Sequence, residues 1–170
     1  MKVLSLLQPW ASLLANGIKL KETRSWKTNH RGQLAIHASQ KLFYPKQIAK
    51  YWTLPEEQEM VMEALKNIGY TDANKPLPAG KILGVGVVGN CREMVLLEPQ
   101  YLMDDSPMFS IPTLTPLERA LGHYAPGRFA WDVKEAQPLD EPVIFKGGMN
   151  LSREYNDPLV IKGKNVNLQL

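Results

Sequence analysis

Residues 17–24 read Gly-Ile-Lys-Leu-Lys-Glu-Thr-Arg, and this stretch joins a predicted helix to a predicted strand. The helix covers residues 9–16, because Pro9 fits its first position and apolar residues recur along one stripe of it. Gly17 stands where a left-handed C-terminal cap belongs. Lys19 is therefore predicted to lie at the junction of helix and strand.

The strand that follows, over residues 20–26, carries two opposite charges on one face. Strand alternation places Glu22 and Arg24 on the same side, close enough to interact. A solvated edge pair of this kind contributes only about 0–1 kcal/mol. Leu20 and Trp26 flank the pair on its own face, which favours a partly sheltered site instead. Sheltered charges need partners and are often functional.

The remaining pattern predicts an α+β domain. Further strands are expected over residues 1–7, 33–39, 81–88, 128–134 and 142–145. A helix is expected from Pro55 to Gly69, and a capping box at Thr115 begins a short one. Because helices are inserted irregularly between strands, we expect a small, mostly antiparallel β-barrel or curled sheet with peripheral helices, in one domain over residues 1–170.

Composition limits the class of protein. The 170 residues carry a net charge of +3, which permits a local anion contact but not general coating of nucleic acid. No stretch is apolar enough for a membrane span, and the one cysteine, Cys91, fits a reducing, cytoplasmic setting. The three histidines have no metal-ligand spacing, and Asp104-Asp105 offers at most a weak cation site. We expect no metal, no cofactor and no membrane partner.

The pattern Gly-x-Lys-x-x-Glu-x-Arg, formed by Gly17, Lys19, Glu22 and Arg24, resembles the signature of ASCH domains, relatives of the PUA fold. Three further segments resemble the family in the same order, namely residues 4–11, 31–39 and 127–131. The resemblance covers most of the chain and implies a small PUA-like β-barrel. Residues 44–79 and 92–112 look like variable insertions.

The resemblance also implies a cleft where Lys19, Glu22 and Arg24 meet RNA or a nucleotide. Some small members of the family are amidohydrolases that deacetylate acetylated cytidine, with the motif lysine as base and a threonine as nucleophile. Lys19 matches the base, but Glu22 occupies the place of the nucleophile. A carboxylate does not replace a hydroxyl nucleophile in amide cleavage without new support.

Four other residues are candidate contacts for a ligand. Gln8 and Trp10, before and within the first helix, offer an amide and a stacking surface, although a tryptophan there is more often core. Trp26 lies among basic residues, as in single-strand binders. His37 is a possible acid or base in the cleft, although a lone histidine on a strand is more often a hydrogen-bonded spectator.

Two functions follow from these residues. The first is a binding module for RNA or a modified nucleotide, in which Lys19 and Arg24 contact the ligand and Glu22 orients Arg24. The alternative is a nucleotide-directed hydrolase, an acetylated-cytidine amidohydrolase or a ribonuclease, with Lys19 and Glu22 as base and acid. An adaptor with a vestigial cleft is a third reading. The absent hydroxyl at position 22 favours binding, and the sequence leaves the ligand and the oligomeric state open.

Overall fold

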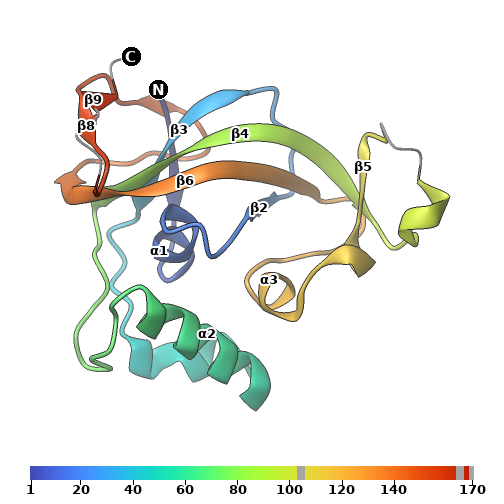
Figure 1. The fold of residues 1–170 in the computed structure, drawn as a ribbon, viewed down its shortest axis with the longest axis horizontal. Helices are drawn as coiled ribbons and strands as arrows, with labels where there is room; N and C mark the ends of the chain where they lie inside the picture. Colours follow the sequence, from blue (N-terminus) through green and yellow to red (C-terminus); the bar gives the residue numbers. More distant parts are fainter. Residues whose placement is uncertain (103–105, 164–166, 169–170) are drawn as a thin grey trace.

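The computed structural model describes residues 1–102, 106–163 and 167–168, and its main feature is one curled sheet (Figure 1). The sheet has the strand order β2-β6-β4-β3-β1-β7, with β5 beside β4. Its strands are β1 (Lys2–Leu6), β2 (Lys21–Arg24), β3 (Gly32–Ala38), β4 (Lys81–Val95), β5 (Met108–Ser110), β6 (Phe129–Ile144) and β7 (Arg153–Glu154). The short strands β8 (Leu159–Val160) and β9 (Asn167–Leu168) pair with each other.

The helices lie on one side of this sheet (Figure 1). They are α1 (Trp10–Ala15), α2 (Pro55–Asn67) and α3 (Pro116–Ala120), with the 3-10 turns η1 (Pro45–Lys50), η2 (Pro99–Tyr101) and η3 (Ile111–Thr113). The α+β class and the helix beginning at Pro55 are confirmed. Asp104 and Asp105 lie outside the described residues.

The prediction of a closed barrel is wrong, because the sheet is open. The sheet ends at β2 on one side and at β7 on the other, and in the described part of the chain these edges do not pair. Two strand pairs are parallel, β1 with β3 and β4 with β5, so the sheet is mixed. Alternation along a strand shows which side chains share a face, but it does not show the direction of the neighbouring strand.

Two predicted strands are in fact one. The expected strands over 128–134 and 142–145 belong to the continuous β6, which pairs with β4 through several register shifts. Glu135 adopts a positive φ of 52°, and Pro138 lies in the irregular part of the pairing. A bulged strand of this kind looks like two strands with a turn between them when it is read from sequence.

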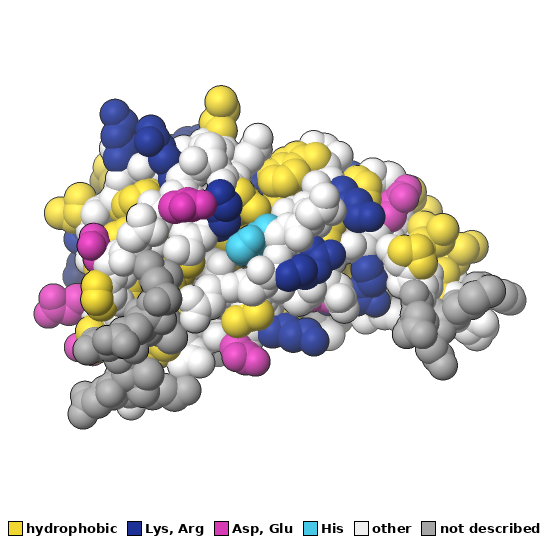
Figure 2. Space-filling model, turned by 90° about the horizontal axis from the view of Figure 1, so that it is seen from above, with side chains coloured by type: hydrophobic (Ala, Val, Ile, Leu, Met, Phe, Trp, Pro, Cys, Tyr) yellow, Lys and Arg dark blue, Asp and Glu magenta, His cyan; other side chains and the backbone are white. Residues whose placement is uncertain are grey.

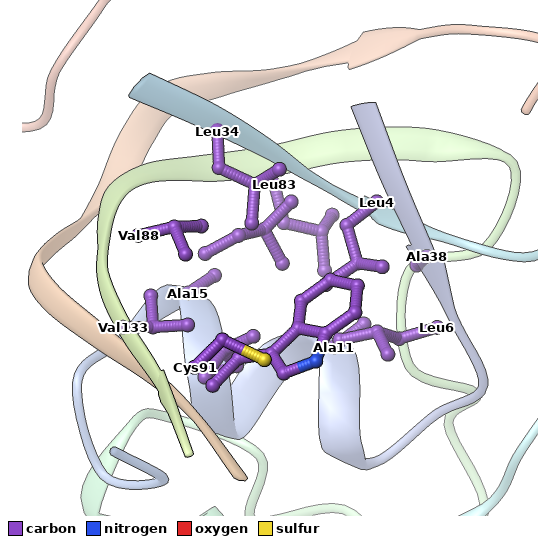
Figure 3. Close-up of a cluster of buried hydrophobic side chains, with 13 residues drawn as sticks. Leu4, Leu6, Ala11, Ala15, Leu34, Ala38, Leu83, Val88, Cys91 and Val133 are labelled. Atoms are coloured by element: carbon purple, nitrogen blue, oxygen red, sulfur yellow. The ribbon is translucent and has the colours of Figure 1, made fainter. Parts of the chain in front are cut away.

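The main core lies between the sheet and α1. Ala11 and Ala15 of α1 pack against strand residues that include Leu4 and Leu34, and the curled sheet wraps around them (Figure 3). The approach is close: a Cβ added to Gly84 of β4 would lie 2.9 Å from the Cβ of Ala15. The small residues at this contact therefore allow α1 to pack closely on the sheet.

A second core joins α1 to the peripheral helices. Leu13 of α1 packs with Leu65 of α2, with Phe43 and Trp52 on either side of η1, and with Leu121 just after α3. The opposite face of the sheet, seen in Figure 2, carries Lys and Arg side chains dispersed among others rather than in one continuous patch. No helix among the described residues is long and apolar enough to cross a membrane.

Candidate functional site

Lys19 is fully buried where α1 gives way to β2. The carbonyl of Leu13 accepts hydrogen bonds from the backbone N–H groups of both Ile18 and Lys19, so the chain turns sharply after Gly17 at φ 70°. The Lys19 residue is only 1% exposed. Among the described residues its ammonium has no hydrogen-bond partner. A buried ammonium without a hydrogen-bond partner is unfavourable, so its presence in a folded protein needs an explanation.

Glu118 is the carboxylate nearest to the ammonium of Lys19 that the structure records, at 3.9 Å. Its two oxygens accept hydrogen bonds from the backbone N–H groups of Leu20, at 2.9 Å, and Lys21, at 3.2 Å. The hydroxyl of Tyr124 donates to the same carboxylate at 2.5 Å. Glu118 thus fixes the start of β2 and is already occupied by three donors.

Burial governs the electrostatics of this group. Desolvation lowers the pKa of Lys19 below its usual 10.5, while the charges of Glu22 and Glu118 act in the opposite direction. Desolvation also raises the pKa of Tyr124, and the adjacent Glu118 carboxylate raises it further. Tyr124 therefore remains a neutral hydrogen-bond donor, whereas Lys19 loses its proton more easily than a lysine in water.

Glu22 and Arg24 form the second part of the site. Nε of Arg24 lies 2.9 Å from Oε1 of Glu22, which confirms the predicted contact. The N–H of Nε does not point at the carboxylate, so the contact is an ion pair and not a hydrogen bond. The side chain of Arg24 is 25% exposed, and its Nη2 also donates to the carbonyl of Ser5 at 3.4 Å. The guanidinium is thereby oriented but still reachable.

These side chains border a cleft of about 620 Å³. Lys19, Glu22, Thr23 and Arg24 form one part of its lining, and the end of β1 adds Ser5, Leu6 and Leu7. Arg119 to His123, which form the end of α3 and the turn that follows it, line a second part together with Arg128. The cleft is within the usual size range of small-molecule sites, and it carries more cationic than anionic side chains.

The remaining wall is aromatic. The rings of Trp10 and Tyr51 meet edge to face with their centroids 5.6 Å apart, and Trp10 and Trp52 lie 5.3 Å apart. Nε1 of Trp52 donates to the carbonyl of Ala120 at 2.7 Å, which links the stretch just after η1 to the end of α3. Tyr51 remains 40% exposed. An aromatic surface with an open edge therefore lines the same cleft as Arg24.

The structure separates the other residues that the sequence singles out. Trp10 lines the cleft, but Gln8 is buried and its amide donates to Ser12 and to the carbonyl of Pro78. Trp26 packs edge to face on the buried Trp131, with centroids 4.7 Å apart, outside the cleft lining. His37 borders a different cavity.

Two features of the site differ from the sequence analysis. Leu20 does not shelter the ion pair, because it precedes β2 and is 55% exposed. Glu118 has another role besides the predicted capping box at Thr115, whose hydroxyl does accept a hydrogen bond from the backbone N–H of Glu118. Its contacts with Leu20 and Lys21 join residues about a hundred positions apart, and no local pattern reports them. In the described part of the chain, no three His, Cys, Asp or Glu residues gather as a metal site.

The curled mixed sheet with its short helix and basic cleft defines an α+β protein of the PUA-like type. The family model of the ASCH domain matches residues 4–142, and the chain belongs to the ASCH domain family. It is also similar to activating signal cointegrator 1 of Homo sapiens and of Mus musculus, with 53% identity over 47 residues in each case. Those matches cover 28% of this chain and 8% of each relative, so the chain corresponds to a small part of those proteins.

Proposed function

We propose that this protein binds single-stranded RNA or a modified nucleotide in the cleft lined by β2, the end of α3 and the stretch just after η1. The observation that carries the proposal is the buried ammonium of Lys19, which has no hydrogen-bond partner among the described residues and borders a cleft with Arg24. Desolvating an ammonium without compensation is unfavourable. A ligand that supplies a phosphate or carbonyl oxygen there would complete its hydrogen bonding.

The two sides of the cleft suit the two parts of a nucleotide. Arg24, Arg119 and Arg128 supply positive charge on the lining. A guanidinium binds phosphate through paired N–H donors, which a point charge cannot reproduce. Trp10 and Tyr51 offer aromatic faces and edges on which a base can stack, as in proteins that bind unpaired nucleic acid. We place the phosphate toward Arg24 and the base toward Tyr51.

Membership of the ASCH family supports this function, because the family resemblance implies RNA or nucleotide recognition at this motif. Glu22 supports it as well, because its carboxylate orients Arg24 and is not free to act on a ligand. The dispersed charge on the sheet face seen in Figure 2 fits a confined contact better than wrapping of a long nucleic acid.

The test is binding of a fluorescein-labelled single-stranded RNA of about eight nucleotides, followed by anisotropy at two salt concentrations. Arg24→Ala and Lys19→Ala should each weaken binding by about tenfold or more, since hydrogen bonds to charged groups contribute roughly 1.5–3 kcal/mol. Arg24→Lys should restore only part of the affinity. The matched control is Lys27→Ala, because Lys27 is exposed and outside the cleft lining. Equal affinities for all these variants, each shown to be folded, would remove the cleft from the proposal.

The hydrolase alternative has one observation in its favour. Burial lowers the pKa of Lys19, and a lysine with a lowered pKa is a better general base near neutral pH. The cleft also contains the hydroxyl of Thr23, which accepts a hydrogen bond from the backbone N–H of His123 at 3.2 Å. A nucleotide-directed hydrolase therefore remains the second candidate function.

A further inference from the structure

A second cavity, of about 360 Å³, lies beside β1 and β3 and is separate from the nucleotide cleft. It is lined by Ser5, His37, Ser39, Gln40 and residues 146–149, which follow β6. Of these residues only Ser5 also borders the first cleft. The backbone carbonyl of Ser5 receives Arg24 there, whereas its hydroxyl contacts His37. The function proposed above uses none of the side chains in this second cavity.

Ser5 and His37 form a hydrogen-bonded pair across neighbouring strands. They are register partners in the parallel pairing of β1 and β3, and Oγ of Ser5 lies 3.0 Å from Nδ1 of His37. Nε2 of the same ring lies 3.0 Å from the carbonyl oxygen of Phe145. A carbonyl only accepts, so Nε2 carries the ring proton and Nδ1 presents its lone pair. The Ser5 hydroxyl therefore donates to Nδ1.

The imidazole is held in the form that a general base requires. His37 is 2% exposed, and burial lowers its pKa below the usual 6.5, so the ring is neutral at physiological pH. The Phe145 carbonyl fixes the tautomer and the ring orientation, a task that a carboxylate performs in many serine hydrolases. A nucleophile, a base in hydrogen-bond contact and a group that orients the base are thus all present.

The segment over residues 146–149 passes directly against this pair. A Cβ added to Gly147 would lie 2.4 Å from Oγ of Ser5 and 2.5 Å from Nδ1 of His37, so only glycine fits there. Within the described part of the chain, the backbone N–H groups of Gly147 and Gly148 donate to no protein acceptor. Oγ of Ser39, also buried, has no hydrogen-bond partner among those residues. Residues with unused hydrogen-bond donors therefore line the same cavity as the hydroxyl and its base.

We propose that Ser5 is the nucleophile, and His37 the general base, of a second site that hydrolyses small carboxylic esters. Oγ of Ser5 forms a bond to the ester carbonyl carbon as its proton passes to Nδ1 of His37. The resulting oxyanion lies against the free N–H groups of residues 147 and 148. The bond to the alcohol oxygen then breaks, and this oxygen takes the proton from Nδ1.

Water completes the reaction. It attacks the acyl group on Ser5 while His37 accepts one of its protons, the bond from Oγ to the acyl carbon breaks, and Oγ recovers the proton. The products are an alcohol and a carboxylic acid, and the step needs no cofactor. A cavity of about 360 Å³ is at the lower end of the range for ligand sites, which limits the acyl group to a short one.

The experiment uses a fluorophosphonate probe and p-nitrophenyl acetate on the full chain. The probe should modify Ser5, as located by peptide mass spectrometry, and Ser5→Ala should abolish both the label and the catalysed hydrolysis above background. His37→Gln keeps hydrogen-bonding groups in the same place but is not a base, so it should slow labelling by about a hundredfold or more. Ser25→Ala, at an exposed serine elsewhere, is the control and should label like wild type.

A melting curve for each variant separates catalysis from a purely structural link between the strands. If the pair only connects β1 to β3, Ser5→Ala and His37→Gln will melt earlier, and wild-type Ser5 will remain unlabelled. That outcome overturns the proposal, as does a label on Ser5 whose rate is unchanged in folded His37→Gln. A label on Ser5 that depends on His37, in variants that melt like wild type, establishes it.

Discussion

The ammonium nitrogen of Lys19 lies 3.9 Å from Oε1 of Glu118, beyond hydrogen-bond distance, although both groups are buried. The Glu118 carboxylate instead accepts from two backbone N–H groups and from Tyr124. Glu22, the other acidic group near Lys19, pairs with Arg24. Both carboxylates therefore have closer partners than the lysine, whereas the ammonium of Lys19 feels their charges but has no hydrogen bond to either among the described residues.

This asymmetry predicts that stability and binding respond in opposite directions at Lys19. Lys19→Met should raise the free energy of unfolding by about 1 kcal/mol, because it removes a poorly compensated buried charge and keeps a chain of similar shape. The same variant should lose about tenfold in RNA affinity. Urea unfolding and anisotropy measure the two quantities. Lys27→Met is the matched control, and its free energy of unfolding should differ from that of the wild type by less than about 0.5 kcal/mol. A strong loss of stability in Lys19→Met would show that the ammonium is satisfied in the folded chain.

The pH dependence of stability follows from two groups with opposite effects. Because the pKa of Lys19 is lowered from 10.5 on folding, the unfolded chain binds more protons just below that pH, and stability should rise with pH toward about 10. The pKa of Tyr124 is raised from 10.0, so above pH 10 the folded chain keeps a proton that the unfolded chain loses, and stability should fall. Urea midpoints across pH 7 to 11 test this. Lys19→Met should remove the rise, and Tyr124→Phe should remove the part of the fall that Tyr124 contributes.

Glu118 should matter for stability more than an ordinary surface glutamate. Glu118→Gln replaces one acceptor oxygen by a donor that faces another donor, so we expect a loss of roughly 2 kcal/mol in the free energy of unfolding. Glu63→Gln on the exposed side of α2 is the control and should change little. Hydrogen exchange at Leu20 and Lys21 should accelerate in Glu118→Gln alone. Unchanged exchange there would mean that Glu118 does not anchor β2.

Two glycines of β4 should respond differently to alanine. A Cβ at Gly84 would lie 2.7 Å from the carbonyl oxygen of Gln137 and 2.9 Å from the Cβ of Ala15, so Gly84→Ala should lower stability by about 1–3 kcal/mol. At Gly89 the nearest atom is the flexible end of Lys134, at 3.4 Å, and Gly89→Ala should be tolerated. The melting temperatures of the two variants, compared with the wild type, test this difference. Similar losses at the two positions would contradict the close packing of α1 on β4.

If the protein were an amidohydrolase, it would deacetylate acetylated cytidine. We expect no such activity. Glu22 is ion-paired with Arg24 and, when ionised, has no proton for Lys19 to remove. Purified protein should release no more cytidine from acetylated cytidine than Lys19→Ala does, across pH 6 to 10. Glu22→Thr restores a hydroxyl and should gain a trace of activity. Robust turnover by the wild-type chain that disappears in Lys19→Ala would reverse the order of the two functions.

The local parts of this site could be predicted from sequence, because they depend on neighbours along the chain. The turn at Gly17 and the shared face of Glu22 and Arg24 follow from helix capping and strand alternation. The role of Glu118 could not be predicted in this way, nor could the parallel pairing that brings Ser5 beside His37. Both depend on long-range contacts, for which residue spacing carries no signal. The open sheet was missed for the same reason, since closure is decided at the edges β2 and β7.

Two parts of the cleft lining, the exposed ring of Tyr51 and the basic groups of Lys19 and Arg24, come from segments that lie apart in the sequence. Tyr51 belongs to the stretch just after η1, whereas Lys19 and Arg24 belong to the connection from α1 into β2. If the proposed function holds, substitutions near Tyr51 should change which base is preferred without disturbing the groups that we propose hold the phosphate. Selectivity for the base and affinity for the phosphate would then evolve independently. An exchange of residues 45–54 between relatives would transfer the base selectivity without the phosphate affinity.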